Sequence, residues 1–162
     1  MRGSGGVGRF AVGTVEEARQ LRENGFEDEE ILMLRSTVDR EELEQLVDLN
    51  VVCTVSSVDT GLALNAVAEN RSTVAEAHIQ VDTGLGFGGF LAGEPEKILL
   101  AYRSLPNVAL SGIYTQLHAV SLKDNEVGRQ LVQHDQILDA IHQAGFQTGM
   151  VHDAGYFALL QF

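Results

Sequence analysis

The sequence predicts an α/β fold in which parallel strands alternate with helical crossovers. Two observations predict it: short apolar runs recur along the chain, and amphipathic helical stretches separate them. The runs cover residues 10–12, 31–34, 51–55, 75–81, 108–115 and 150–154. The residues alone leave open an open twisted sheet or part of a barrel. Both architectures place their chemistry at the carboxyl ends of the strands, so the search for function narrows to a few loops.

Helix-start signals follow most of these runs. Thr14 with Glu17, and Asp39 with Glu42, have the spacing of a capping box, which satisfies free amide donors at a helix start. Pro95 suits the first turn of a later helix. The remaining helices are expected over residues 59–69, from 94 to about 105, over 128–144, and from 157 to 162, where only an opening turn is present.

Size and composition fit one domain with a real core. The chain has 162 residues and 44% apolar content, and we expect a flexible Gly-rich leader over residues 1–8 before a domain over 9–162. No apolar stretch is long enough to span a bilayer, and no signal-peptide pattern is evident. The net charge of −12 argues against nucleic-acid and membrane-surface partners. The single cysteine, Cys53, is expected to be a buried structural thiol, which fits a reducing cytoplasm.

The number of strands raises a question about the edges of the sheet. Six parallel strands do not close an eight-stranded barrel, so two edges would stay open. Either the sheet is open and twisted, or another chain supplies the missing parts. We therefore predict self-association through the open edges.

Several segments, in order and spacing, resemble one family. They cover residues 9–18 with 21–25, 30–34, 78–86 and 111–115, and a weaker match lies within 151–160. The run Asp82-Thr83-Gly84-Leu85-Gly86 is the most specific of them. Together they are similar to the N-terminal barrel domain of the alanine racemase family. This resemblance implies that residues 9–162 form an incomplete TIM-type (β/α) barrel, with about six parallel strands, outer helices and a pyridoxal 5′-phosphate site. The implied chemistry is removal and return of the α-proton of an amino acid, the small-molecule partner if the chain is active.

The resemblance also assigns cofactor-binding positions. Gln116 stands where the family has a histidine packed on the cofactor ring, and His118 follows two residues later. Gly155 and Tyr156 stand where the family has an Asn-Ser pair that helps to bind the phosphate.

Two further positions depart from the family pattern. Gln80 stands where the family places a lysine, and Phe87 replaces the arginine that supports the cofactor. No catalytic residue is assigned to this chain.

The Schiff-base lysine of the family decides what activity to expect. The match runs from the family's second strand to just past its seventh, so this lysine, on the first strand, is expected to be absent. We expect Lys97 to be solvated on a helix, and Lys123, in a loop near the functional face, is a weak substitute. The resemblance therefore predicts a racemase domain that is inactive alone.

Two alternatives to a racemase remain open. The first is a non-catalytic homologue or an engineered barrel scaffold. The second is a metal-dependent lyase or hydrolase, in which Asp82, His118, His152 and Asp153 converge on Zn²⁺ or Mn²⁺.

Other motifs have plainer interpretations beside functional ones. The glycines 84, 86, 88 and 89 indicate a tight turn more readily than a dinucleotide site. His78 is expected to be a core or interface histidine with its hydrogen bonds satisfied, whereas His134 and His142 are expected to be exposed on a helix.

Overall fold

The computed structural model describes residues 8–118 and 125–154 as alternating strands and helices. The strands are β1 (Arg9–Val12), β2 (Glu30–Met33), β3 (Cys53–Val55), β4 (Ala75–Asp82), β5 (Phe90–Leu91), β6 (Val108–Gln116) and β7 (Met150–Ala154). The helices are α1 (Val15–Glu23), α2 (Arg40–Asp48), α3 (Val58–Asn70), α4 (Pro95–Ser104) and α5 (Glu126–Gln143).

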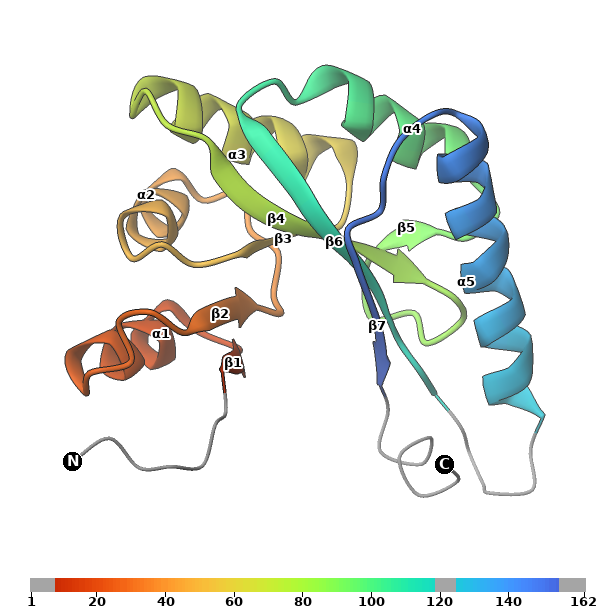
Figure 1. Ribbon diagram of the computed structural model, residues 1–162, viewed down its shortest axis with the longest axis horizontal. Helices are drawn as coiled ribbons and strands as arrows, with labels where there is room; N and C mark the ends of the chain where they lie inside the picture. Colours follow the sequence, from red (N-terminus) through yellow and green to blue (C-terminus); the bar gives the residue numbers. More distant parts are fainter. Residues whose placement is uncertain (1–7, 119–124, 155–162) are drawn as a thin grey trace.

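All strand pairs run parallel and follow the order of the chain. β1 pairs with β2, a second sheet runs β3-β4-β6-β7, and β5 pairs with β4. An isolated bridge between Leu32 and Val52 joins the two sheets, with Met33 N donating to Val52 O at 2.9 Å. The strands form an arc with the helices on its outer side (Figure 1). This confirms the predicted α/β fold and is consistent with an incomplete TIM-type barrel.

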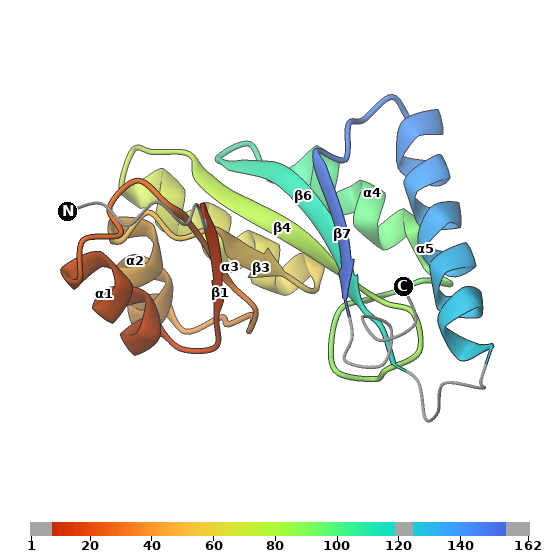
Figure 2. The same ribbon diagram turned by 60° about the horizontal axis from the view of Figure 1, so that its bottom comes forward.

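The two ends of the arc do not meet. β1 and β7 stand well apart in both views (Figures 1 and 2), and in the described part of the chain no hydrogen-bonded pairing joins them. Each therefore has a neighbouring strand on one side only among the elements described. The expected open edges are present at β1 and β7.

The hydrophobic core lies between the outer face of the sheet and the helices. Val55, Ile79 and Ile113, on β3, β4 and β6, are fully buried. The helices cover them with their own fully or nearly fully buried side chains: Leu43 and Leu46 on α2, Leu64 on α3, Ile98 on α4, and Ile137 and Ile141 on α5. Burial of these side chains is the main stabilising term of the fold.

The helix starts predicted at Thr14, Asp39 and Pro95 are confirmed. Thr14 Oγ1 accepts a hydrogen bond from Glu17 N at 3.2 Å, and the Glu17 carboxylate accepts one from Thr14 N. Asp39 caps α2 in the same way through Glu42 N, although without the return bond. α4 begins at Pro95 with no side-chain cap, and proline suits this first turn because its position needs no amide hydrogen bond.

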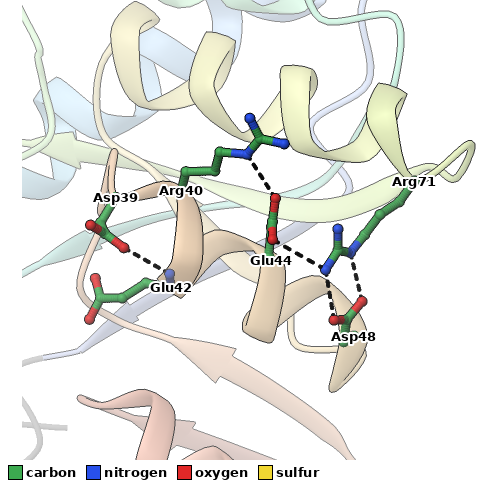
Figure 3. Close-up of polar contacts among 6 residues, drawn as sticks. All are labelled: Asp39, Arg40, Glu42, Glu44, Asp48 and Arg71. Atoms are coloured by element: carbon green, nitrogen blue, oxygen red, sulfur yellow. Dashed lines mark hydrogen bonds and ion pairs between the residues drawn. The ribbon is translucent and has the colours of Figure 1, made fainter.

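Part of the acidic charge is neutralised on the outer layer of helices (Figure 3). Arg71, at the end of α3, makes two contacts with the Asp48 carboxylate, at 2.7 and 2.8 Å, and a longer one of 3.6 Å to Glu44. Arg40 donates to Glu44 at 2.8 Å from within α2. Arg40 and Asp48 are exposed and Glu44 and Arg71 are partly exposed, so the network links α2 to α3 at the surface without a large gain in stability.

The structure corrects three expectations about the elements. β5 was not predicted, because two residues are too few to show a periodicity. β3 is shorter than the apolar run 51–55, and Val52 makes only the isolated bridge. His134 is buried, with 1% of its surface exposed, whereas His142 is exposed as expected. The predicted leader (1–8, all but its last residue) and final helix (157–162) lie outside the described residues.

No helix in the described ranges is long and apolar enough to cross a membrane.

Candidate functional site

The inner face of the arc carries polar residues at alternate positions of its strands. On β4, the side chains of Ala77, Ile79 and Val81 belong to the helix-covered core. Successive side chains of a strand point to opposite faces, so His78 and Gln80 lie on the inner face. Both are buried, with 2% and 6% of their surfaces exposed. The inner face of the sheet is therefore a polar surface.

A histidine pair and a tyrosine form the centre of this face. His78 Nδ1 lies 2.9 Å from His152 Nε2 on β7, so one ring nitrogen donates its proton and the other accepts it. The ring of Tyr114, on β6 between them, stacks on His152 with centroids 4.9 Å apart and planes inclined by 15°. Three neighbouring strands thus contribute one ring each.

Tyr114 is anchored at its hydroxyl as well. Its Oη lies 3.0 Å from Thr54 Oγ1 on β3, and Thr54 itself donates to Met33 O at 2.7 Å. Tyr114 Oη also donates to Leu34 O at 3.3 Å. The Tyr114 ring is therefore held both by stacking and at its hydroxyl. We refer to His78, His152, Tyr114 and Thr54 as the interior cluster.

Burial keeps the interior cluster neutral. Loss of solvent lowers the pKa of His78 to about 4, and the nearby His152 and Arg9 add to the shift. Burial also lowers the pKa of His152, against the opposing pull of Asp153 and Glu30. Burial raises the pKa of Tyr114, partly offset by its bond to Thr54. At neutral pH the cluster therefore carries two neutral imidazoles and a neutral phenol.

A glycine on β6 makes room for His78. A Cβ atom added to Gly112 would lie 2.5 Å from His78 Nε2, closer than real Cβ contacts come. Gly112 pairs with His78 in the register between β4 and β6. The glycine is therefore required here by close approach of an imidazole ring.

The predicted cofactor-binding residues are only partly within the described structure. Gln116 is exposed and ends β6, on the same face as Tyr114 by strand alternation. His118 is also exposed, two residues further, and the Gln130 side chain holds its backbone. Gly155 and Tyr156 lie outside the described residues. The structure thus brings Gln116 and His118 to the carboxyl end of β6, and the cofactor-binding role of all four residues stays a prediction.

The Gly-rich loop after β4 is a compact turn. Asp82 Oδ1 accepts hydrogen bonds from Gly84 N at 2.9 Å and Gly86 N at 3.0 Å. All four glycines of the loop have positive φ values between 73° and 134°, a conformation that favours glycine. The neighbouring cleft, of about 400 Å³, is lined by the carboxylates Asp82 and Glu126. Two carboxylates disfavour a phosphate here, so the tight-turn interpretation accounts for the glycines.

The two positions that depart from the family pattern differ in burial. Gln80 is buried on the inner face, where no amine replaces the expected lysine. Phe87, in the Gly-rich loop, has 78% of its surface exposed. Neither side chain supplies a positive charge at the carboxyl ends of the strands.

The lysines do not fit a Schiff base in the part of the chain that the structure describes. Lys97 lies on α4, half exposed, with Nζ 2.8 Å from the Glu94 carboxylate. That hydrogen bond raises its pKa, which keeps the amine protonated and non-nucleophilic. Lys123 lies outside the described residues. Residues 8–118 and 125–154 therefore present no free amine to pyridoxal 5′-phosphate, and we derive no chemical step through that cofactor.

The candidate metal ligands do not converge. His152 faces the interior cluster, whereas Asp153, the next residue of the same strand, faces α5 and lies 2.7 Å from His134 Nδ1. Asp82 is turned into the Gly-rich loop. Among the described residues no group of three or more His, Cys, Asp or Glu side chains is arranged to hold a metal ion. The expected convergence is wrong because consecutive strand residues point to opposite faces.

Cys53 is a structural thiol, as the sequence predicts. It is buried on β3, and burial raises its pKa to about 12. The thiol is therefore not ionised at neutral pH and is unsuited to act as a nucleophile.

Sequence reasoning missed several polar residues that organise the site. Tyr114 and Thr54 form the interior cluster with the two histidines, and Gln130 and His134 are buried on α5. For Tyr114, strand alternation with its apolar neighbour Ile113, which lies in the core, was the available signal. For His134, its place four residues after Gln130 and three before Ile137 on one helical stripe was the available signal.

Comparison with known proteins agrees with this architecture. The family described as "Alanine racemase, N-terminal domain" matches residues 2–161. An alanine racemase of Desulforamulus reducens is 27% identical over 159 residues, which are 97% of this chain and 42% of the relative. The alanine racemase of Clostridium tetani is 30% identical over 160 residues, 96% of this chain and 40% of the relative. The chain thus spans about two fifths of the length of these relatives.

Solved structures show the same fold. An alanine racemase of Clostridium difficile 630 superposes with a TM-score of 0.84 at 24% identity, covering 95% of this chain and 42% of that chain. The alanine racemase of Corynebacterium glutamicum gives 0.78 at 26% identity, covering 93% and 42%. A D-threo-3-hydroxyaspartate dehydratase from Delftia sp. gives 0.76 at 21% identity, covering 91% and 46%. With the family match over nearly its whole length and these parallel strands, the chain belongs to the alanine racemase N-terminal domain family.

Proposed function

We propose that this chain forms the larger part of the barrel of a pyridoxal 5′-phosphate-dependent amino-acid racemase and does not racemise amino acids by itself. One observation carries the proposal: the inner face holds a neutral polar cluster, and the described carboxyl ends of the strands hold no free amine. His78 and His152 have lowered pKa values, and Lys97 is paired with Glu94 away from them. In this proposal the chain supplies the polar inner face of the barrel, and the amine that attaches the cofactor covalently comes from outside the described residues.

Within this proposal Gln116 and His118 contact the cofactor from the end of β6. Both side chains are exposed there, and Gln116 shares the inner face with Tyr114. Gly155 and Tyr156 are proposed to contact its phosphate. The substrate class would be amino acids, as in the relatives named alanine racemase.

A cofactor titration tests the proposal. The chain is mixed with pyridoxal 5′-phosphate, its visible absorbance is recorded, and borohydride treatment precedes digestion and mass analysis. We expect no band of a lysine-linked cofactor and no conversion of L-alanine to D-alanine. The control variants are Lys97→Arg and Lys123→Arg, each of which keeps the charge and removes the amine. A band that borohydride fixes, and that one of these variants abolishes, would show that the chain holds the cofactor covalently.

The second candidate is a non-catalytic homologue or engineered scaffold with the same framework. The observation that favours it is the character of Gln80 and Phe87, which place an uncharged amide and an exposed aromatic ring at positions where the family uses cations. To separate the two candidates, the chain is mixed with separately prepared barrel segments of a relative that lie outside the matched region, and racemisation of L-alanine is measured. Recovery of activity supports the racemase part, and a folded complex without activity supports the scaffold.

We also propose self-association through the open edges of the sheet. Beside β1 a groove of about 640 Å³ is lined by Phe10, Ala11, Val12, Leu21 and Phe26 together with the polar residues Glu17, Gln20 and Asn24. A strand that pairs with β1 would cover this groove and satisfy the free edge. Light scattering over a range of concentrations is expected to show dimers or larger species. A strictly monomeric chain at high concentration would contradict this part of the proposal.

The cellular setting is proposed on similar grounds. Cys53 is buried and gives no opportunity for a disulfide within the chain, which suits the reducing cytoplasm. The net charge of −12 gives no support for a nucleic-acid or membrane-surface partner.

A further inference from the structure

Helix α5 buries two polar side chains against the sheet. Gln130 and His134 each expose 1% of their surface and lie one turn apart on the face that also buries Val127, Ile137 and Ile141. Burying polar groups is costly unless they have partners, so an apolar residue would be the ordinary choice at both positions. Ile137 and Ile141 lie on the later turns of α5. Gln130 and His134 lie on earlier turns, near the carboxyl ends of β6 and β7.

Gln130 holds the backbone just beyond β6. His118 N donates to Gln130 Oε1 at 2.9 Å, and Gln130 Nε2 donates to His118 O. The ladder between β6 and β7 ends at Gln116, so His118 has left the paired strand. A single side-chain amide thus satisfies both backbone groups of a residue that no strand pairs, which fixes the path of the chain after β6.

His134 lies against β7. Its Nδ1 makes a close polar contact of 2.7 Å with Asp153 Oδ1, in the last part of that strand, although neither ring nitrogen has a partner with hydrogen-bond geometry in the described structure. Asp153 points outward, opposite to the neighbouring His152, which faces the interior cluster. The contact therefore ties the end of β7 to α5 without using the inner face.

We propose that Gln130 and His134 are positioning residues: α5 sets where the chain leaves β6 and β7 and thereby places Gln116 and His118. That this positioning serves cofactor binding rests on the proposed function, in which Gln116 and His118 contact the cofactor. The positions of these two residues depend on the fold alone and are measured separately.

Amide hydrogen exchange on the full chain tests the role of Gln130. Gln130→Met keeps the length of the side chain and removes both hydrogen bonds, so the His118 amide is expected to exchange about tenfold faster while Ile79 and Ile113 keep their protection. Gln130→Glu retains an acceptor for His118 N but turns a carboxylate oxygen toward His118 O and Glu126, so a partial loss of His118 protection is expected. Gln136→Met, an exposed position of the same helix, is the matched control and should change neither.

Two results would overturn the proposal for Gln130. One is unchanged exchange at His118 in Gln130→Met. The other is a rise of equal size at His118, Ile79 and Ile113, which indicates a general loss of stability. If Gln130→Met fails to fold, the native chain decides, because exchange of its His118 amide at the rate of an unprotected amide contradicts the hydrogen bond to Gln130.

The role of His134 is tested at the end of β7. Asp153→Asn keeps the shape and removes the charge, and faster exchange of the Ala154 amide is expected with unchanged exchange at Ile113. Unchanged exchange at Ala154 would remove His134 from the proposal.

A separate measurement distinguishes the positioning of Gln116 and His118 from their role in cofactor binding. Titration of the native chain with pyridoxal 5′-phosphate, followed by NMR, is expected to shift the side-chain resonances of Gln116 and His118. Absence of any shift would count against the proposed function, while the exchange measurements still judge the positioning. A shift that Gln130→Met weakens, with Gln136→Met unchanged, supports both.

Discussion

At the scale of single residues, Arg22 holds together the loops at the amino ends of the first strands. Its guanidinium donates to four backbone carbonyls, those of Phe26, Glu29, Leu49 and Asn50, at 2.7 to 2.9 Å. Nothing in the spacing of Arg22 along the sequence reports its contacts to residues 27 and 28 positions away. The fork of five N–H donors makes arginine the suitable residue for such a cluster.

Arg22→Ala is expected to lower the free energy of unfolding by about 2–4 kcal/mol, because four carbonyls lose their donor and three of these hydrogen bonds are partly buried. Arg40→Ala removes an exposed arginine whose partner is Glu44 and should cost less than about 1 kcal/mol. Urea denaturation of both variants measures the difference. Equal losses would show that the Arg22 contacts do not stabilise the fold.

The lowered pKa of His78 predicts a dependence of stability on pH. Between pH 6.5, the ordinary pKa of histidine, and about 4, the pKa of His78 in the folded chain, the unfolded chain binds a proton at His78 and the folded chain does not. Stability is therefore complete above pH 6.5 and is lost as the pH falls toward 4, by up to roughly 3 kcal/mol. Below that range the folded histidine also binds its proton, and this contribution to the slope ends.

Denaturation from pH 7.5 to 4 compares the native chain with His78→Gln, which cannot titrate. The variant is expected to lose less stability over the interval from 6.5 to 4, and the remaining slope belongs to His152 and the carboxylates. Parallel curves for the two proteins would show that His78 is not buried neutral.

At the scale of elements, helix starts were the most predictable features. The signals at Thr14 and Asp39 are local, because a cap side chain bonds to an amide three residues away. The end of β6 and the start of α5 were less predictable, and α5 begins at Glu126 rather than residue 128. Those boundaries depend on contacts such as that of Gln130 with His118, which the local sequence does not report.

Asp39→Ala is expected to destabilise the chain by about 1 kcal/mol, since Glu42 N loses its acceptor at the start of α2. Glu41→Ala, an exposed position in the same first turn, should cost only a few tenths of a kcal/mol through the helix dipole. Thermal melts of both variants measure the two effects. A loss for Glu41→Ala as large as for Asp39→Ala would indicate that charge, and not the cap, sets the stability of this helix.

At the scale of the whole molecule, the covered outer face and the open edges have opposite consequences. The outer face holds one continuous core beneath all five described helices, whereas β1 and β7 each have an edge that no other described strand pairs with. Stability is thus concentrated in the middle strands, and association is expected at the ends of the arc.

Ile79→Ala, in the centre of the core, is expected to cost about 2–5 kcal/mol, because the side chain is fully buried between β4 and the helices. Leu62→Ala removes a side chain of α3 that is 45% exposed and should cost well under half as much. Chemical denaturation compares them. A small loss for Ile79→Ala would mean that the sheet and helices are less tightly packed than the structure shows.

The sequence by itself determined the class of the fold, the order of its main elements, the family and the isolation of a buried thiol at Cys53. These follow from short-range signals: apolar periodicity, caps and an ordered set of motifs. Only the tertiary structure decided which polar residues meet. His78 reaches His152 across 74 positions of the chain, and His134 is buried against Asp153 rather than exposed. Such pairs are set by the register of parallel strands and by the packing of a helix across them, and neither is written in the local pattern of residues.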